Sequence, residues 1–271
     1  MPGPIGLLGG LEHYPLTESL DRQLLEEVGV CSPSVIVLPF ACLPWQEVAA
    51  GELARSHWTR IGARVRVQCR QRGIPDLATL GAIRNADVIV LPGGVPHRLL
   101  GALVGTLLWE EVADRWRAGA AVTGSSAGAM ALFEKRVALD PTNLLRLVPG
   151  LGLLAGYVAG PHFDRLHVRR WLALALGRVA PLGILGLDES TGLVGRPGAM
   201  KVLGAGSVTI AERDRVETYG AGAVIDIDLV NRSSVASERL LAQRDEPRAR
   251  IDPELHRDAR PYKPSRLGKT N

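Results

Sequence analysis

Short apolar segments alternate with helical patterns through the first 123 residues, and this alternation constrains the fold more than any other feature. The strands predicted from it cover residues 5–8, 34–39, 64–68, 88–91 and 120–123. Helical periodicity separates several of them, over residues 20–28 and 46–61. Strands joined by helices in this way form parallel sheets with right-handed crossovers. Residues 64–68 alternate, but the other strands are almost continuously apolar, so helices are expected on both faces, which predicts a three-layer α/β domain.

Five apolar residues at four-residue spacing predict one further helix after the fourth strand. They are Leu100, Val104, Leu108, Val112 and Trp116. This spacing places their side chains on one face, and Gly119 is a typical signal for the end of a helix. We therefore expect a single continuous helix over this stretch.

The second half of the chain has a different pattern. Two further strands are predicted over residues 157–160 and 184–188, and an amphipathic helix between them carries Val168, Leu172 and Leu176. From residue 192 to residue 228, glycines punctuate short alternating segments, which is typical of antiparallel strands. We expect these segments to form a small meander appended to the sheet, as a C-terminal β-extension.

Charge separates this domain from the end of the chain. Residues 232–271 hold ten basic and six acidic residues, which accounts for the whole net charge of +4. Residues 1–231 are thus neutral overall, and aromatic residues make up only 4% of the chain. A basic face with stacking aromatics is therefore not indicated, and we expect no nucleic-acid partner. We predict one folded domain over residues 1–231 and an Arg-rich tail over 232–271, partly ordered or disordered.

The cellular location is predicted from what the sequence lacks. Its apolar segments are far too short to cross a bilayer, and it shows no export signal at its start. The three cysteines, Cys31, Cys42 and Cys69, are odd in number and have no metal-binding spacing. We expect a cytoplasmic protein without disulfides, a structural metal or membrane contact.

A G-x-S-x-G motif at residues 124–128 is the most informative feature for function. It lies between a short apolar strand and a helix-forming run, the context in which this motif forms a sharp nucleophile-bearing turn. The hydroxyl of Ser126 would then lie at a helix N-terminus, where backbone N–H groups favour developing negative charge. We predict Ser126 as the nucleophile and Ser125 as a structural neighbour.

A serine nucleophile needs a base, and the base needs an acid to orient it. His162 follows a predicted strand and is the candidate base. Glu189, at the end of a later strand, and Asp140, between Ser126 and His162, are the two candidate acids. Because catalytic groups gather at the carboxyl ends of strands, we favour Glu189, and Asp140 remains the alternative.

Donors for an oxyanion are expected at two places. The strand over residues 88–91 ends in Pro92-Gly93-Gly94, and glycines at a strand end let backbone N–H groups approach a substrate closely. The residue after the nucleophile supplies the second donor in such turns. We predict the N–H groups of Gly94 and Ala127.

Four motifs in this order resemble one known family. Pro92-Gly93-Gly94, Ser126-Ala127-Gly128-Ala129, His162-Phe163 and Asp188-Glu189-x-Thr191 are similar to the serine peptidases that include peptidase E and cyanophycinase. That resemblance implies a class I glutamine amidotransferase-like (flavodoxin-like) fold, with serine where the amidotransferases have a nucleophilic cysteine. It covers most of residues 5–230.

The sequence also departs from that family's patterns. Cyanophycinases usually have Asp-x-His-Phe where this chain has Gly160-Pro161-His162-Phe163, and their arginines after this motif lie at other offsets than Arg165, Arg169 and Arg170. A polar pair usually follows the double glycine, whereas this chain has Val95-Pro96. The resemblance therefore supports the chemistry better than it supports a particular substrate.

These observations together predict a serine-type peptidase that cleaves small peptides or isopeptides through an acyl-enzyme. We expect no cofactor, and the sequence leaves open whether the chain forms a homodimer. Two alternatives remain at this stage: an α/β-hydrolase-type esterase, and a non-catalytic ligand-binding member of the same fold. The arginines after His162 could bind an acidic group or form a solvated helix face, and His97 is expected as a solvated residue at the rim of the site.

Overall fold

Five parallel strands form the centre of the computed structural model, which describes residues 1–70, 76–139, 145–165, 179, 181–227 and 229. The strands of the main sheet are β1 (Ile5–Leu8), β2 (Ser34–Val37), β3 (Arg64–Val67), β4 (Val88–Leu91), β5 (Ala121–Ser125), β10 (Thr191–Arg196), β11 (Ala199–Gly204) and β14 (Val224–Ile225). Their order in this eight-stranded sheet is β14-β11-β10-β1-β5-β4-β2-β3. β1 to β5 are mutually parallel, and β10, β11 and β14 extend the sheet in antiparallel fashion.

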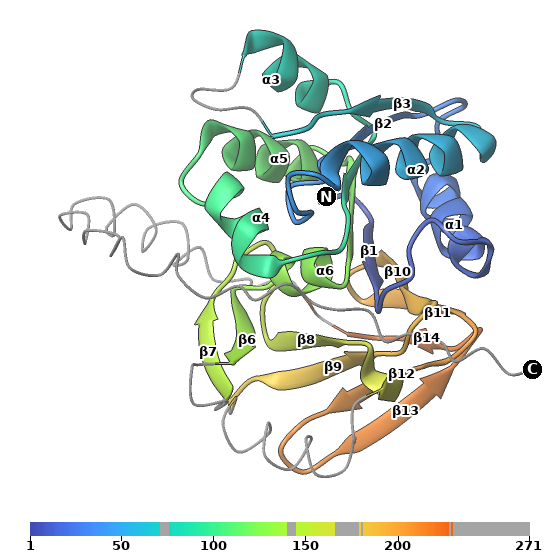
Figure 1. The fold of residues 1–271 in the computed structure, drawn as a ribbon. Coiled ribbons are helices and arrows are strands. Elements are labelled where there is room, and N and C mark those ends of the chain that lie inside the picture. The colour runs from blue at the N-terminus through green and yellow to red at the C-terminus, as the bar shows by residue number, and fades with distance from the viewer. Residues whose placement is uncertain (71–75, 140–144, 166–178, 180, 228, 230–271) are drawn as a thin grey trace, which may run out of the picture. The chain divides into compact units, whose positions relative to one another are not determined.

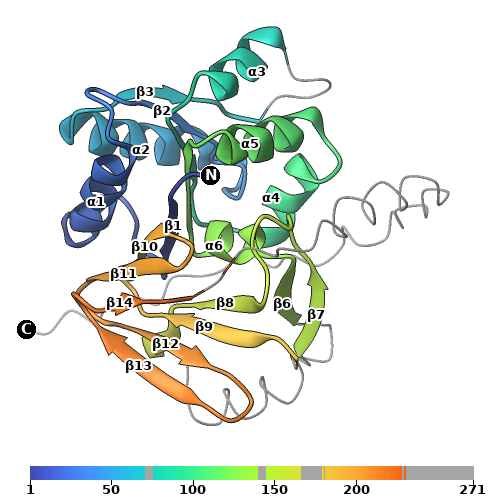
Figure 2. The same cartoon turned by 180° about the vertical axis from the view of Figure 1, so that it is seen from behind.

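Helices cover both faces of this sheet, as predicted. They are α1 (Glu18–Val28), α2 (Glu47–Arg60), α3 (Leu77–Arg84), α4 (Pro96–Leu103), α5 (Leu107–Arg117) and α6 (Ala127–Leu132), with a 3-10 turn η1 at Pro15–Thr17. Figures 1 and 2 show α1 and α2 on one face and α3, α4 and α5 on the other. The side chains of β4 alternate accordingly, because Val88 and Val90 pack with the first pair of helices and Ile89 and Leu91 with the other set.

A second sheet lies beside the carboxyl ends of the central strands (Figure 1). It contains β8 (Tyr157–Pro161), β9 (Gly183–Leu187), β12 (Ser207–Ala211) and β13 (Val216–Gly220) in the order β13-β12-β9-β8. A hairpin of β6 (Lys135–Leu139) and β7 (Leu145–Pro149) precedes it, and η2 (Phe163–Arg165) follows β8. β8 and β9 are parallel, so their carboxyl ends lie together.

The single helix predicted over Leu100 to Trp116 is wrong, because the chain forms two helices there. Gly105 adopts φ +67°, and the Thr106 hydroxyl donates to Leu103 O at 2.7 Å and accepts from Trp109 N at 3.4 Å. A left-handed glycine followed by an N-capping threonine ends one helix and begins the next. Val104, expected on the buried face, is 53% exposed at this break.

The meander predicted over residues 192–228 is also corrected, because its strands divide between the two sheets. β10, β11 and β14 join the main sheet, whereas β12 pairs with β9, with Val208 opposite Leu187 and Ile210 opposite Leu185. Alternation in a sequence shows which side chains share a face, but it does not show which strand edge they pair with.

Some expectations fall outside the described part of the chain. The predicted helix carrying Val168, Leu172 and Leu176 lies among residues that are not described, and so does the tail over residues 232–271. Met1–Arg232 packs as one unit. The boundary between residues 231 and 232 stays a prediction.

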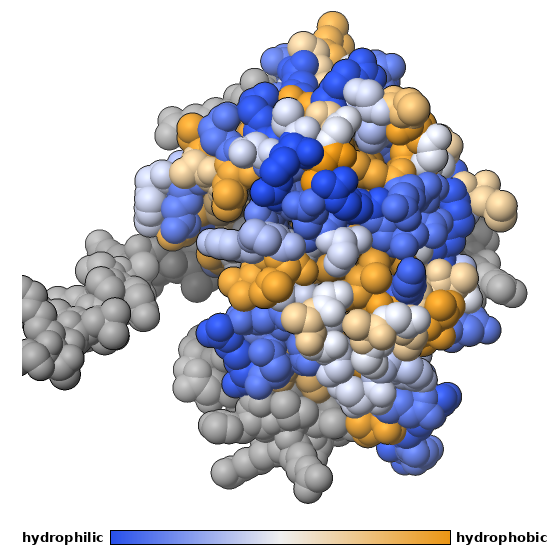
Figure 3. All heavy atoms as spheres, turned by 90° about the vertical axis from the view of Figure 1, so that its right-hand side faces the viewer, coloured by the Kyte–Doolittle hydropathy of each residue, from blue (hydrophilic) through white to orange (hydrophobic). Residues whose placement is uncertain are grey.

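The surface shown in Figure 3 is mostly hydrophilic, with apolar residues scattered between charged and polar ones. Scattered apolar side chains are ordinary on protein surfaces. Within the described residues, every helix is too short or too polar to cross a membrane.

Candidate active site

The turn that carries Ser126 joins β5 to α6 and has a strained backbone. Ser126 has φ 48° and ψ −108°, and its N–H donates to Leu8 O at 3.0 Å. A Cβ on Gly124 would lie 2.6 Å from the Gly128 carbonyl carbon, and one on Gly128 would lie 2.0 Å from Leu91 O. Only glycine fits at these two positions, which explains in physical terms why the motif contains them.

His162 follows β8 and faces this turn. Its ring atom Nε2 lies 3.0 Å from Ser126 Oγ. The backbone N–H of His162 donates to Gly9 O at 3.0 Å. His162 also has a positive φ of 53°. A Cβ on Gly10 would lie 2.3 Å from Cε1 of the imidazole, so the loop after β1 packs directly against the ring.

Glu189 follows β9 and contacts the other side of the imidazole. Its Oε1 lies 2.8 Å from His162 Nδ1, and its Oε2 lies 2.6 Å from Arg165 Nη2. Because a carboxylate only accepts hydrogen bonds, this contact assigns the ring proton to Nδ1 and leaves Nε2 free to accept from the Ser126 hydroxyl. The structure thus brings together the three side chains predicted as nucleophile, base and acid.

The neighbours of Glu189 hold its turn in place. Asp188 Oδ2 accepts from the N–H and the hydroxyl of Ser207, at 2.8 and 2.7 Å. Thr191 Oγ1 accepts from Gly206 N at 2.7 Å and donates to Glu189 O at 3.1 Å. The Asp-Glu-x-Thr motif therefore combines one carboxylate that faces the imidazole with two side chains that fix the backbone around it.

The two predicted oxyanion donors are backbone N–H groups with no acceptor in the described part of the chain. Gly93 N donates to Glu12 and Val95 N donates to Ala41 O at 2.8 Å, so the Gly94 N–H lies between two engaged amides. Gly94 adopts φ +140°, and a Cβ there would lie 2.5 Å from Ala41 O. Ala127 is the first residue of α6, where an N–H has no partner within the helix.

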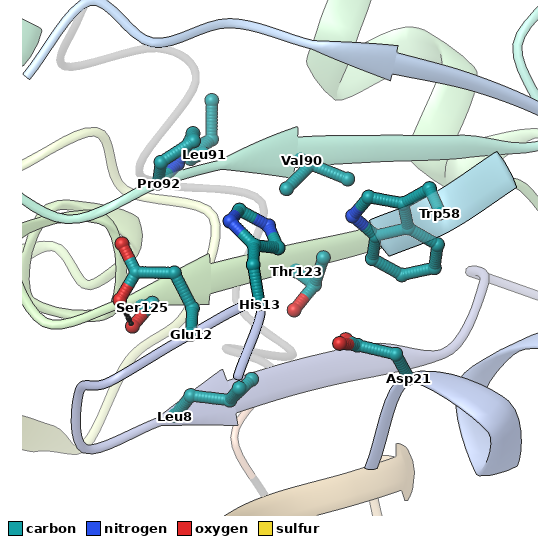
Figure 4. Close-up of a pocket in the computed structure, with 10 residues that line it drawn as sticks. All are labelled: Leu8, Glu12, His13, Asp21, Trp58, Val90, Leu91, Pro92, Thr123 and Ser125. Atoms are coloured by element: carbon teal, nitrogen blue, oxygen red, sulfur yellow. Dashed lines mark hydrogen bonds between the residues drawn. The ribbon is translucent and has the colours of Figure 1, made fainter. Parts of the chain in front are cut away.

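Glu12 is a site residue that the sequence interpretation missed. It lies in the loop after β1 and accepts from Gly93 N and from Ser125 Oγ, each at 2.7 Å. Figure 4 shows its carboxylate directed at Ser125. The available signal was its position two residues after Gly9-Gly10, at the carboxyl end of a predicted strand. Such a glycine pair also suggests a dinucleotide loop, but the G-x-G-x-x-G pattern is not met there.

The remaining candidates have different outcomes. Asp140, Arg169 and Arg170 lie outside the described residues, so Asp140 stays an untested alternative for the acid. Arg165, considered either as a ligand for an acidic group or as part of a solvated helix face, forms an ion pair with Glu189. His97 is exposed, as expected of a solvated residue.

The cysteines and possible metal ligands complete the description of the site. Cys31, Cys42 and Cys69 are free thiols. Cys42 donates to Gly93 O at 3.6 Å, and burial raises the pKa of its thiol to about 11. A group of three or more histidine, cysteine or acidic side chains placed to hold a metal ion is not found among the described residues.

Comparison with known proteins places this geometry in a family. The model of peptidase family S51 matches residues 7–202. The cyanophycinase of Nostoc sp. (strain PCC 7120 / SAG 25.82 / UTEX 2576) is 33% identical over 223 residues, which cover 76% of this chain and 72% of that protein. The cyanophycinase of Trichormus variabilis (strain ATCC 29413 / PCC 7937) is 34% identical over the same shares of the two chains.

A solved structure agrees with this placement at the level of the fold. The crystal structure of a peptidase from an acI-B1 Actinobacterium superimposes with a TM-score of 0.74, at 23% identity, over 84% of this chain and 98% of that one. Together with the family match over more than half of the sequence, these findings establish that the chain belongs to peptidase family S51, the class I glutamine amidotransferase-like serine peptidases that include peptidase E and cyanophycinase.

Proposed function

We propose that this S51 serine peptidase hydrolyses small peptides or isopeptides through an acyl-enzyme formed on Ser126. The observation that carries the proposal is the hydrogen-bonded chain from Ser126 Oγ to His162 Nε2, 3.0 Å, and from His162 Nδ1 to Glu189 Oε1, 2.8 Å. Both distances lie within hydrogen-bond reach, so one proton can pass from the serine to the imidazole as the hydroxyl attacks.

The reaction follows from these contacts. Ser126 Oγ attacks the amide carbonyl carbon while its proton moves to His162 Nε2. The tetrahedral intermediate collapses, the C–N bond breaks, and His162 returns the proton to the leaving nitrogen. Water then attacks the acyl ester, gives a proton to His162, and releases the acid while Ser126 regains its hydrogen. Glu189 holds the imidazole in place and stabilises its positive charge during both halves.

The proposal also assigns two backbone groups to the oxyanion. In this proposal the N–H groups of Gly94 and Ala127 donate to the carbonyl oxygen as it gains negative charge. Their support is that neither donates to another described residue, while the amides of Gly93 and Val95 on either side of Gly94 do. Donors that are already oriented stabilise the transition state without a cost of reorganisation.

The substrate class rests on the resemblance and on the surroundings of Glu189. The relatives at 33% and 34% identity are named cyanophycinases, which makes cyanophycin the first polymer to test. Arg165 forms an ion pair with Glu189, and its side chain is 68% exposed. The family match leaves no support for the α/β-hydrolase esterase.

The proposal is tested first by a fluorophosphonate probe on folded protein. We expect one covalent label on wild type, located to the peptide with Ser126, and none on Ser126→Ala. Ser34→Ala is the matched control, since that serine lies at the opposite ends of the strands and should leave labelling unchanged. Folded wild type without any label would contradict the proposal and favour a non-catalytic ligand-binding protein.

Substrate turnover is then measured with α-linked dipeptides, isopeptides and cyanophycin. Ser126→Ala should lower kcat by at least about 10³-fold for whichever class is cleaved, because the nucleophile is removed. Turnover that survives in Ser126→Ala at the wild-type rate would assign the activity to another residue or to a contaminant.

A further inference from the structure

Glu12 joins two parts of the site that the sequence separates widely. It lies 81 residues before Gly93 and 113 residues before Ser125, yet it contacts both. We propose that Glu12 is a positioning residue that holds the loop bearing the Gly94 N–H against the turn bearing Ser126 and Ala127. This inference rests on the proposed function, because it concerns the geometry of the oxyanion donors.

The two contacts use both oxygens of one carboxylate. Oε1 accepts from Gly93 N and Oε2 accepts from Ser125 Oγ, each at 2.7 Å. Hydrogen bonds to an ionised acceptor are short and roughly twice as strong as neutral ones. Figure 4 shows Glu12 in the loop after β1, with its carboxylate beside Ser125. The side chain therefore spans the carboxyl ends of β1, β4 and β5.

Hydrogen bonds fix the loop after β4 at the backbone N–H groups of Gly93 and Val95. The N–H of Gly94 lies between them and has no acceptor among the described residues. Gly93 N is held by Glu12 and Val95 N by Ala41 O, and Cys42 Sγ donates to Gly93 O. The direction of the Gly94 N–H is then set by the peptides on either side of it. If the Glu12 contact is lost, one of these two amide anchors is lost.

The turn after β5 is fixed through the neighbour of the nucleophile. Ser125 immediately precedes Ser126, and Glu12 holds its hydroxyl. The same carboxylate thus sets the position of both oxyanion donors relative to each other. A displacement of about 1 Å in a catalytic group can lower a rate by roughly 10²-fold.

The backbone around Glu12 is strained on both sides. Leu11 has φ 57° and His13 has φ 65°, backbone conformations that residues other than glycine and asparagine rarely adopt. Such conformations are energetically costly and persist where the surroundings determine them strongly. Two of them flanking one half-buried side chain indicate that the loop is bent in order to deliver this carboxylate.

The test compares variants that separate charge from geometry. Glu12→Ala should lower kcat by about 10- to 100-fold and change KM less than about threefold, because the donors serve the transition state more than the bound substrate. Glu12→Gln should keep kcat within about threefold of wild type, since its amide can accept from Gly93 N and donate to Ser125 Oγ. Ser125→Ala, which removes only one contact, should fall between them.

Asp87 offers a matched control. Its Oδ2 also accepts from a backbone N–H and a serine hydroxyl, both of Ser34, at 2.8 and 2.9 Å. It does so at the amino ends of β2 and β4, away from the site. Asp87→Ala should therefore cost stability without the selective loss of kcat. An equal kcat loss in Asp87→Ala and Glu12→Ala would reduce Glu12 to a structural residue and overturn the proposal.

Amide hydrogen exchange tests the same inference without relying on catalysis. In Glu12→Ala the peptide that contains Gly93 and Gly94 should exchange at least about tenfold faster than in wild type, and in Asp87→Ala it should not. Unchanged protection there overturns the proposal. If Glu12→Ala does not fold, Ser125→Ala decides, since a folded variant with wild-type kcat would contradict the proposal.

The two hypotheses fail in distinguishable ways. An inactive, unlabelled wild type contradicts the proposed function and leaves the exchange experiment to decide on Glu12. An active wild type that depends on Ser126 but shows full kcat in Glu12→Ala contradicts the Glu12 proposal alone.

Discussion

Three residues around the candidate triad have backbone conformations that are rare for their type. Ser126 has φ 48°, His162 has φ 53°, and Ser190, next to Glu189, has φ 53°. Each such residue costs roughly 1–3 kcal/mol, and tertiary contacts must supply that energy. Here Leu8 O, Gly9 O and Gly10 O accept the N–H groups of these three residues, respectively. The backbone carbonyl oxygens of β1 and of the loop that follows it thus stabilise these strained conformations by accepting hydrogen bonds.

The identity of the acid is the first prediction at this scale. Glu189→Gln should lower kcat by roughly 10²- to 10⁴-fold, because a neutral amide neither stabilises the imidazolium nor fixes the ring proton on Nδ1. Asp140→Asn should keep kcat near wild type. Steady-state kinetics on the best substrate measure both. The reverse pattern would move the role of the acid to Asp140.

Arg165→Ala serves as a control for this comparison. It removes the ion pair with Glu189 Oε2 and leaves the contact of Oε1 with His162. Because the arginine side chain is 68% exposed, its loss should cost less than about tenfold in kcat. A loss as large as that of Glu189→Gln would show that the arginine has a further role.

At the scale of elements, the site forms where two sheets meet. Ser126 follows β5 of the main sheet, whereas His162 and Glu189 follow β8 and β9 of the second sheet. The loop after β1 contacts both, since His162 N donates to Gly9 O at 3.0 Å and Ser190 N donates to Gly10 O at 3.1 Å. Gly9-Gly10, which resembles the start of a phosphate loop in the sequence, instead joins the two sheets.

The contact between the loop after β1 and His162 predicts that one methyl group added at Gly10 will strongly lower kcat. Gly10→Ala would place a Cβ 2.3 Å from the imidazole at φ +135°, so the ring must move away from Ser126. We expect kcat to fall by at least about 10²-fold, together with a loss of stability. Kinetics and thermal unfolding of the same sample measure the two effects.

Gly62→Ala is the matched control for Gly10→Ala. Gly62 has φ +100°, and a Cβ added there would meet no described atom within 4 Å, so the substitution adds backbone strain without a collision. Its Tm should fall while kcat stays near wild type. If both variants lose stability but neither loses kcat, the loop after β1 does not position His162.

At the scale of the whole molecule, a buried polar cluster lies under the site. His13, Asp21 and His57 are at most 8% exposed, and Asp21 Oδ2 lies 2.8 Å from His57 Nε2. Arg60 donates to His57 Nδ1 at 3.1 Å, so His57 Nε2 carries the proton that Asp21 accepts. Figure 4 shows His13 and Asp21 lining a small cavity with Trp58, whose Nε1 has no hydrogen-bond partner among the described residues.

This cluster makes stability depend on pH. Burial lowers the pKa of His13 to about 4; Glu12 opposes this lowering, and His57 adds a smaller lowering of its own. The unfolded chain, with an ordinary histidine pKa near 6.5, binds a proton in this range that the folded protein excludes. The His13 contribution to the free energy of unfolding is therefore complete above about pH 6.5 and is lost as the pH falls towards 4.

Replacing His13 should flatten the pH dependence of the free energy of unfolding. Between about pH 7.5 and about pH 5, His13→Gln should remove roughly 2 kcal/mol of the fall in unfolding free energy. Denaturant unfolding at several pH values measures it, with His97→Gln, at a more exposed histidine, as the control with the smaller change. Superimposable pH profiles for wild type and His13→Gln would show that His13 titrates normally in the folded protein.

Local features of the sequence determined much of the main sheet and one part of the site. Strand positions follow from apolar runs, and the turn at residues 124–128 follows from side-chain volume, because a Cβ on Gly124 or Gly128 would overlap backbone atoms. These are short-range constraints, which a stretch of a dozen residues contains completely. The same reasoning failed at Val104, where a helical stripe continues in the sequence but Gly105 and Thr106 end the helix.

Only the tertiary structure decided which distant groups meet. The sequence pattern of residues 207–211 predicts a strand, but it does not show that this strand pairs with β9. That pairing depends on which strand has an unpaired edge nearby in the folded chain. Nothing in the sequence shows that Arg165 pairs with Glu189, and Glu12 has no local motif at all. The physical reason is that a hydrogen bond acts over about 3 Å between atoms whose separation along the chain does not matter, so its partner is set by how the whole chain packs.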